Sequence, residues 1–374
     1  MAEEQKNSSA ETVDAATSAA HTVKGAIKAG KAISGAAKGA AAGGHYGAVA
    51  GAVWAGRKHI GKIIAIIAIL LLLPVLFLLM LPGLIFYTAF MILPIFLTAL
   101  ISLTGFNGVN WDTLTWVGGD NYVKLFTDPS NSSVYWNALI NNLKFIAVEY
   151  VIIIPIQLLV SYAFYRKIHF HNFLEGVFFL PYVFSAAVIG FFSTIVFNES
   201  FGMVNKVLMA LGVSKVNLPV FYADTSHAFA LMMGTGIWYS SVIGMMILLS
   251  NMKNIPADVM EAATVDGANE WKKFIHIILP DLGPGMINII VLDAIWGITA
   301  FDLPYVLGGP YGRGGAIDFV NMMFYRTAFG SGAVSSVQTD YGLAAAIGTT
   351  TFVVILILTG ILQSGLRRVK VWNE

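Results

Sequence analysis

The chain has 374 residues, of which 57% are hydrophobic and only 11% are charged. Soluble globular domains carry about 25% charged residues, so this composition indicates a membrane protein. The net charge of +1 gives no sign of a nucleic-acid-binding surface, and we expect no nucleic-acid partner. The absence of cysteine excludes disulfides, thiolate metal sites and cysteine nucleophiles. We find no convincing cleavable secretion signal before the first apolar run.

Residues 1–59 form a low-complexity N-terminal tail rich in glycine and alanine, and its first 20 residues are expected to be disordered. On a helix, its fourfold glycine spacing would form one stripe: Gly35, Gly39, Gly43, Gly47 and Gly51. That stripe is either a packing face for another helix or part of a weakly structured tail. We favour the second alternative, because each glycine costs a helix about 1 kcal/mol relative to alanine. The tail's lysines could also contact anionic membrane lipid.

Six later segments are long and apolar enough for membrane helices, which need about 20 mostly apolar residues. The expected core spans are 84–103, 137–165, 172–197, 227–250, 283–307 and 341–366. The preceding apolar stretch 60–83 predicts an elbow at the membrane surface, an extension of the first core helix, or an extra membrane helix. We favour the first two, because a full crossing would place Arg57, Lys58 and Lys62 outside.

Basic residues predict the orientation of these spans. If the tail and the loop 251–281 are cytoplasmic, sixteen of the 22 basic residues lie inside. Without the tail, eight basic residues lie inside and six lie outside, so much of the support for this orientation comes from the tail. This orientation also places the C-terminal tail 369–374 in the cytoplasm.

The polar loop 251–281 between the fourth and fifth spans carries helix signals of its own. Pro256 suits the first turn of a helix, and Glu261 with the two following alanines favours helix. Gly267 predicts a break or bend, and Pro280 predicts the start of a fresh helix. The pattern therefore predicts a short surface helix near 256–271.

This loop resembles the EAA signature of permease subunits in binding-protein-dependent ABC importers, written E-A-A-x3-G-x9-I-x-L-P. Every fixed position matches, from Glu261 through Gly267 to Pro280. The segment 117–122 and Gly308-Gly309-Pro310 resemble two further family patterns. The resemblance covers residues 84–368 and is strongest to the maltose-type carbohydrate class. The sugar-importer version of the second pattern usually has a Thr shortly before the paired glycines, whereas here Tyr305-Val306-Leu307 precede them.

The resemblance implies an all-α polytopic membrane protein, namely a type I ABC importer permease-like bundle of six core transmembrane helices. It implies three partners in a prokaryotic cell membrane: a second permease subunit, a cytoplasmic ABC ATPase dimer and an extracytoplasmic solute-binding protein. ATP and Mg would be bound by the ATPase, and this chain would hold no cofactor and catalyse no reaction. The implied ATPase-coupling residues are Glu261, Ala262, Ala263, Asp266, Gly267, Ala268, Leu279 and Pro280.

Polar and aromatic residues within the predicted spans are candidates for the substrate path, because ionisable groups inside a membrane usually face a cavity or a partner. The candidates are Trp238, Tyr239, Ser240, Ser241, Asp293, Trp296, Thr299 and Asp302. Aromatic rings stack on sugar faces while polar groups match sugar hydroxyls, which predicts a sugar, oligosaccharide or related neutral solute. Each residue could instead serve packing alone, and the role of Glu149 in the second span stays open.

Three alternative functions would each require particular residues. A permease for another solute, such as a phosphate ester, would need a basic residue facing the path, and the core spans offer Lys144 and little else. A membrane assembly or pore protein driven by the glycine stripe would need no ATPase. A membrane-embedded enzyme is disfavoured, because no convergent histidine, serine or metal-ligand constellation occurs.

Overall fold

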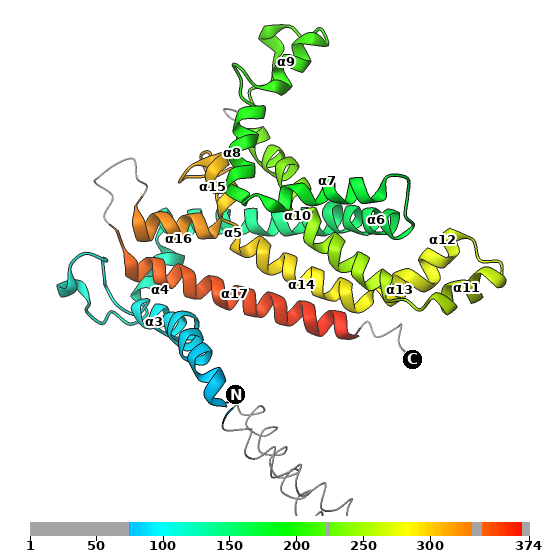
Figure 1. The fold of residues 1–374 in the computed structure, drawn as a ribbon. Coiled ribbons are helices and arrows are strands. Elements are labelled where there is room, and N and C mark those ends of the chain that lie inside the picture. The colour runs from blue at the N-terminus through cyan, green and yellow to red at the C-terminus, as the bar shows by residue number, and fades with distance from the viewer. Residues whose placement is uncertain (1–74, 76, 222–224, 331–338, 369–374) are drawn as a thin grey trace, which may run out of the picture. The chain divides into compact units, whose positions relative to one another are not determined.

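The computed structural model describes residues 75, 77–221, 225–330 and 339–368 (Figure 1). The predicted tail 1–59, most of the stretch 60–83 and the C-terminal residues 369–374 lie outside these residues. The chain divides into two compact units, Met1–Pro94 and Ile95–Glu374. The described residues are mostly helical and contain only one isolated antiparallel bridge, between Thr104 and Trp116. The predicted all-α class is therefore confirmed.

The helices in chain order include a few single turns of wider π-helix or tighter 3-10 geometry, marked η. They are η1 (Thr88–Ile92), α3 (Leu93–Ile101), η2 (Trp111–Thr113), α4 (Asp120–Thr127), α5 (Pro129–Val148), η3 (Glu149–Ile153), α6 (Ile154–Tyr165), α7 (His171–Val183), α8 (Ala186–Val196), α9 (Met203–Ala210), η4 (Lys215–Asn217), α10 (Thr225–Lys253), α11 (Ala257–Val265), α12 (Glu270–Lys273), η5 (Phe274–Ile278), α13 (Leu279–Asp281), α14 (Gly283–Thr299), α15 (Asp302–Gly308), α16 (Val320–Phe329) and α17 (Tyr341–Arg368).

Five continuous helical segments of the described chain are long and apolar enough to cross a membrane. They are Phe77–Ile101, Pro129–Tyr165, His227–Lys253, Gly283–Gly308 and Tyr341–Leu366. A sixth crossing is present if the bent pair α7 and α8 counts as one span. The polytopic bundle predicted from the sequence is confirmed. The first segment begins before residue 84, so residues 77–83 continue into the first core span.

The third predicted span, 172–197, is not one straight helix. Helices α7 and α8 meet at an angle of 100°. Pro181, which has no backbone N–H, lies in the last turn of α7, and the helix ends two residues later. Ser185 then caps α8 by accepting a hydrogen bond from the Val188 N–H at 3.4 Å. The sequence prediction missed this bend because apolarity continues across it.

Prolines inside the other spans are accommodated by π-helical turns. Three such turns each end two residues before a proline: η1 before Pro94, η3 before Pro155 and η5 before Pro280. A proline ring clashes with the carbonyl four residues earlier in an α-helix, and the extra residue of a π turn moves that carbonyl away. The prediction that Pro280 starts a fresh helix is therefore wrong, because the helical path from α12 runs through η5 into α13.

The fifth span is broken between α14 and α15, and asparagine side chains satisfy the carbonyls at the break. Asn142 donates to the carbonyls of Gly297 at 2.6 Å and Ile298 at 3.1 Å. Asn321 donates to the Thr299 carbonyl at 2.7 Å. The last carbonyls of a helix lack partners within the helix, and no water substitutes in a membrane interior. Asn142 also accepts the Val320 N–H at 3.1 Å, so one buried side chain joins α5, α14 and α16.

The segment that leads from α15 to α16 is held in the same way. Asn141 donates to the carbonyls of Gly315 at 2.9 Å and Asp318 at 3.0 Å. The Asp318 carboxylate accepts two hydrogen bonds from the Arg326 guanidinium, at 2.8 and 2.7 Å, in a largely buried pair. A bidentate pair of this kind fixes orientation as well as distance.

Replacing Asn142 should destabilise the bundle strongly. Asn142→Leu keeps the approximate volume but leaves two carbonyls and one N–H unpaired, and each unpaired buried group costs about 1–3 kcal/mol. We expect the free energy of unfolding to fall by at least about 3 kcal/mol on this basis, seen as a lower melting temperature in detergent. Asn137→Leu is the matched control, because Asn137 donates to the Gly315 carbonyl from an exposed position. Equal melting temperatures for the two variants would contradict the assigned role.

Candidate functional site

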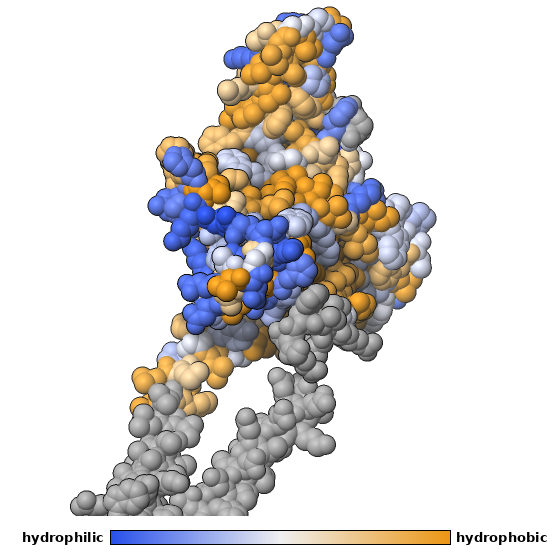
Figure 2. All heavy atoms as spheres, turned by 90° about the vertical axis from the view of Figure 1, so that its right-hand side faces the viewer, coloured by the Kyte–Doolittle hydropathy of each residue, from blue (hydrophilic) through white to orange (hydrophobic). Residues whose placement is uncertain are grey.

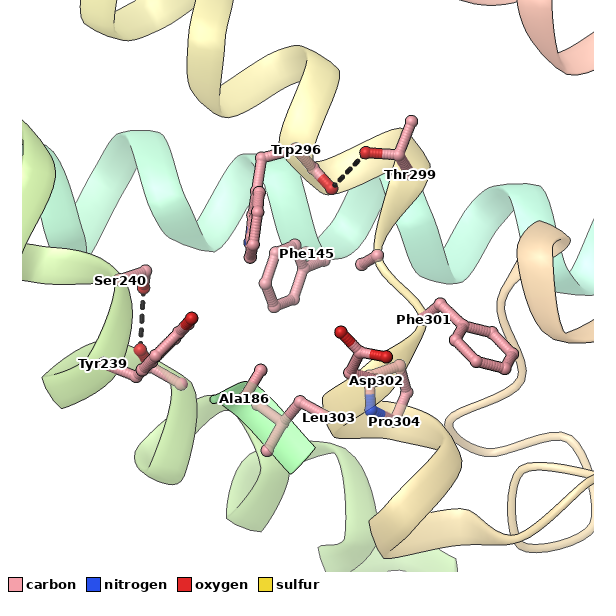
Figure 3. Close-up of a pocket in the computed structure, with 12 residues that line it drawn as sticks. Phe145, Ala186, Tyr239, Ser240, Trp296, Thr299, Phe301, Asp302, Leu303 and Pro304 are labelled. Carbon is pink, nitrogen blue, oxygen red and sulfur yellow. Dashed lines mark hydrogen bonds between the residues drawn. The ribbon is translucent and has the colours of Figure 1, made fainter. Parts of the chain in front are cut away.

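A cavity of about 130 Å³ opens at the break between α14 and α15 (Figure 3). It is lined by residues of α5, α8, α10, α14 and α15: Phe145, Ala186, Gly236, Tyr239, Ser240, Trp296, Thr299, Ala300, Phe301, Asp302, Leu303 and Pro304. Figure 3 shows the side chains of Trp296, Tyr239 and Asp302 converging on one space. The cavity therefore combines four aromatic lining residues with one carboxylate.

A second cavity, of about 290 Å³, adjoins the first. Its walls are Glu149, Tyr182, Tyr239, Ser240, Ile243, Leu292, Asp293, Ile295, Trp296 and Thr299. Tyr239, Ser240, Trp296 and Thr299 line both cavities. The two spaces therefore lie next to each other between α10 and α14, and we call them the path cavities.

The hydroxyl groups in the path cavities donate to their own helices. Ser240 donates to the Gly236 carbonyl at 2.7 Å, and Thr299 donates to the Ile295 carbonyl at 2.8 Å. A hydroxyl that donates in this way keeps its oxygen lone pairs as acceptors. These two residues therefore offer acceptors to a solute that carries donors, as sugar hydroxyls do.

The structure brings together six of the eight predicted path residues: Tyr239, Ser240, Asp293, Trp296, Thr299 and Asp302. Trp238 and Ser241 line neither cavity. Trp238 lies on another face of α10, with 48% of its surface exposed, and Ser241 is buried with its hydroxyl donating to the Ile237 carbonyl. Neighbours on a helix point about 100° apart, so four consecutive residues cannot share one wall.

Sequence reasoning missed several lining residues. Phe145, Tyr182 and Phe301 were not selected as site residues, and the role of Glu149 was left open. Tyr182 stands beside Pro181 in the third span and Phe301 directly precedes Asp302, so both had a signal in the sequence. Phe145 had none, because aromatic residues are common throughout these spans. Glu149 could have been selected, because an ionisable group within a membrane span is costly and usually functional.

The loop between α10 and α14 holds the predicted coupling residues. Glu261, Ala262, Asp266 and Gly267 are exposed, and none of the residues of α11 is buried. Gly267 follows α11 with a φ of +76°, and its N–H and that of Ala268 close the helix on the Thr264 and Ala263 carbonyls at 3.0 and 2.9 Å. This is the usual glycine ending of a helix. One predicted helix near 256–271 is thus two helices, α11 and α12, separated at Gly267.

Helix α12 is fixed to the end of α6. Glu270 pairs with Arg166, and Lys273 donates to Glu270 at 3.0 Å. The Tyr162 hydroxyl donates to the Glu270 carbonyl at 3.3 Å, and its ring lies 4.5 Å from that of Phe274. Hydrogen bonding by Lys273, together with the charge of Arg166, lowers the pKa of the Glu270 carboxyl. Glu270 was not among the site residues predicted from the sequence.

A third cavity, of about 480 Å³, lies beside Glu261. Three lysines line it, namely Lys167 in the turn after α6, Lys253 of α10 and Lys273 of α12, together with Met260 and Thr264 of α11. Figure 2 faces the side on which α11 and α12 lie in Figure 1 and shows hydrophilic residues gathered next to exposed hydrophobic ones. The exposed apolar side chains of this loop include Val265 and Trp271, at 88% and 67% exposure. The loop therefore presents apolar groups within a polar surface.

Comparison with known protein families decides the assignment. Residues 153–371 match the family described as binding-protein-dependent transport system inner membrane component. This chain belongs to that family. The matched region of this inner membrane component includes α10, the loop with α11 and α12, and the helices α14 and α15 that line the path cavities.

Several relatives of this inner membrane component are named as permeases. It is 29% identical over 285 residues to the probable ABC transporter permease YurN of Bacillus subtilis, covering 76% of this chain and 92% of that protein. It is 27% identical over 290 residues to the trehalose/maltose permease MalF of Thermococcus litoralis, covering 76% and 90%. The arabinooligosaccharide permease AraP of Bacillus subtilis is 28% identical over 250 residues, covering 66% and 74%.

A crystal structure of a bacterial ABC transporter involved in the import of alginate contains a chain with the same fold. The TM-score is 0.67 at 20% identity, and the match covers 79% of this chain and 95% of that chain. At that identity the likeness bears on the fold alone. It confirms the importer permease-like bundle predicted from the sequence.

The conformation at Gly267 predicts a selective effect of substitution. Gly267→Ala places a side chain in the left-handed region at a cost of about 1 kcal/mol, although no atom obstructs its Cβ. We expect faster hydrogen–deuterium exchange at the C-terminal end of α11, and a smaller effect for Gly267→Asn, because asparagine tolerates this region better. The control is Gly283→Ala, which has equal space and no positive φ. Identical exchange in all variants would contradict the assignment.

The Glu270 cluster should make the loop sensitive to acid. Because the pKa of Glu270 is lowered in the folded chain, its ion pairs contribute stability above the ordinary carboxyl pKa, and that contribution is lost as pH falls through the lowered pKa. We expect exchange at α12 to rise below about pH 4.5, the ordinary glutamate range, and Glu270→Gln to show raised exchange already at pH 7. Glu175→Gln, on α7, is the control. An α12 exchange rate unchanged by Glu270→Gln would refute the assignment.

Proposed function

We propose that this chain is one of two permease subunits of an ATP-driven importer, and that it forms the path for a sugar, oligosaccharide or related solute. The observation that supports this most directly is the pair of path cavities. They offer aromatic faces, hydroxyl acceptors and carboxylates on opposing helices, which is the combination that sugar rings require. The names of MalF and AraP support the same solute class.

The rival solute, a phosphate ester, finds little support. None of the described residues that line either path cavity is a lysine or arginine. A phosphate group would enter a space that holds carboxylates and no positive charge, which is unfavourable in a low-dielectric interior. The composition of the walls therefore favours carbohydrate over phosphate ester.

The proposed ATPase contact is the loop of α11 and α12. Its exposed Val265 and Trp271 are apolar groups surrounded by polar ones, as at protein interfaces. In this proposal a cytoplasmic ATPase dimer binds ATP and Mg and grips α11 around Glu261 and Gly267. The loop and the C-terminus would then lie in the cytoplasm, and the opposite ends of the spans would receive solute from an extracytoplasmic binding protein.

Movement of the loop has two routes to the path cavities. The first is covalent, because α12 continues through η5 and α13 towards α14, which bears Trp296 and Thr299. The second runs through the Glu270–Arg166 pair to α6. A closing ATPase dimer would thus shift the walls of the path and switch access between the two sides of the membrane. The ATPase would perform all catalysis.

Copurification tests this proposal. We expect the tagged chain, extracted in mild detergent, to bring down an ATPase and a second permease. Glu261→Arg combined with Gly267→Trp should lose at least 90% of the ATPase, because both changes alter the exposed face of α11, and should retain the second permease. Mass spectrometry of the purified material measures both.

The matched control is Glu199→Arg combined with Gly212→Trp. It makes the same charge change and the same substitution at a positive-φ glycine, in the loop between α8 and α10. This control should retain the ATPase. A homo-oligomer without ATPase, unchanged by either double substitution, would overturn the proposal and favour an assembly driven by the glycine stripe.

A further inference from the structure

The larger path cavity contains two carboxyl groups that each have one buried oxygen without a hydrogen-bonding partner among the described residues. Glu149 is 1% exposed, and its Oε1 atom is buried with no partner among the described residues. The Oδ2 atom of Asp293 is also buried with no hydrogen-bonding partner among the described residues. Both residues line the same cavity. Buried polar atoms are nearly always paired, so two unpaired carboxylate oxygens in one cavity indicate a missing donor.

Local geometry fixes the two carboxyl groups on facing helices. Glu149 is the first residue of the π turn η3, and Asp293 lies in α14. The next residue, Tyr150, donates its hydroxyl proton to the Ile290 carbonyl at 2.7 Å, one turn from Asp293. This bond holds η3 against α14 and keeps both carboxyl groups at the cavity. π turns frequently occur at functional sites.

The surroundings of the pair indicate what the donor carries. No lysine, arginine or histidine belongs to the described walls, whose other polar or aromatic members are Tyr182, Tyr239, Ser240, Trp296 and Thr299. Burying carboxylates without a positive charge is costly. A neutral hydroxyl would satisfy the hydrogen bonds but leave the charge of the carboxylates uncompensated. An ammonium group would satisfy the hydrogen bonds and also compensate that charge. Aromatic rings also attract ammonium groups through their π faces.

We propose that the Glu149–Asp293 pair binds a protonated amino group of the transported solute, so that the solute class is an amino sugar or amino-substituted oligosaccharide. The inference rests on the proposed import function and narrows its solute. An ammonium group has N–H bonds to donate, and the two unpaired carboxylate oxygens are acceptors for two of them. The expectation of a neutral solute rested on the scarcity of basic residues, which argues against anions but not against cations.

Equilibrium binding to the full chain, copurified with its partner subunits, tests this inference. The probes are glucosamine, glucose and N-acetylglucosamine, which differ in an ammonium, a hydroxyl and an uncharged amide at one position. We expect glucosamine to bind at least tenfold more tightly than the other two, a difference of about 1.4 kcal/mol, by isothermal titration calorimetry. Asp293→Asn and Glu149→Gln should each abolish this preference, and Glu199→Gln, in the loop after α8, should preserve it.

The outcomes separate the inference from the proposed function. Equal binding of the three sugars, no binding of glucosamine, or a preference that survives both amide substitutions would overturn the inference. Equal binding would mean that the charge of the pair is compensated otherwise, by a proton on one carboxyl group or by a basic side chain of the second permease subunit. Failure to copurify any ATPase would instead count against the import function itself. The comparison of sugars needs no variant, so it stands even if a substitution prevents folding.

Discussion

The need to satisfy backbone carbonyls at helix breaks governs this structure. A membrane interior offers no water to a carbonyl that has lost its helical partner. At the end of α14 the donors are the side-chain amides of Asn142 and Asn321. Because these amides stabilise the break, the chain can turn at Ala300 and Phe301 and begin α15 in a new direction. The cavity beside Trp296 and Asp302 exists at this turn.

Prolines in the membrane spans cause local irregularities in the helices without ending them. Each π turn before Pro94, Pro155 and Pro280 shifts the register of the helix while the chain remains helical. The turn at η3 places Glu149 at a cavity wall, and the turn at η5 lies between the loop helices and α14. Irregular helices therefore occur both at the proposed solute path and along the proposed route from the ATPase.

Much of this arrangement could be read from the sequence, and the reasons are physical. Long apolar runs identified the spans, because the bilayer sets their length. The spacing of residues from Glu261 to Pro280 identified the loop, because all the residues of this pattern lie within one short segment of the chain. The bend between α7 and α8 was missed, since apolarity continues through it. The sequence signal for the bend is Pro181, near the end of α7, followed by Ser185, which caps the start of α8.

Contacts between distant elements could not be predicted in the same way. The pairing of Glu270 with Arg166 joins residues from separate loops, and nothing in either local sequence specifies it. The role of Asn142 depends on carbonyls in another helix. The placement of Trp238 away from the cavities depends on how α10 is rotated in the bundle, which packing against α6 and α7 decides. A single sequence indicates which side of a helix is buried only when polar and apolar residues lie on different sides of that helix. These spans are apolar on most sides.

In the proposed function, the path cavities between α10 and α14 belong to a solute path whose access changes with the ATPase. Because the chain has no cysteine, a single Thr299→Cys variant can report on it directly. The measurement is the rate at which a small, membrane-impermeant methanethiosulfonate reagent modifies this thiol in the assembled complex, with and without trapped ATP, compared with Trp238→Cys on another face of α10. We predict that trapping ATP changes the rate at position 299 at least tenfold and leaves the rate at position 238 nearly unchanged. Equal rates at position 299 in the two states would contradict the account.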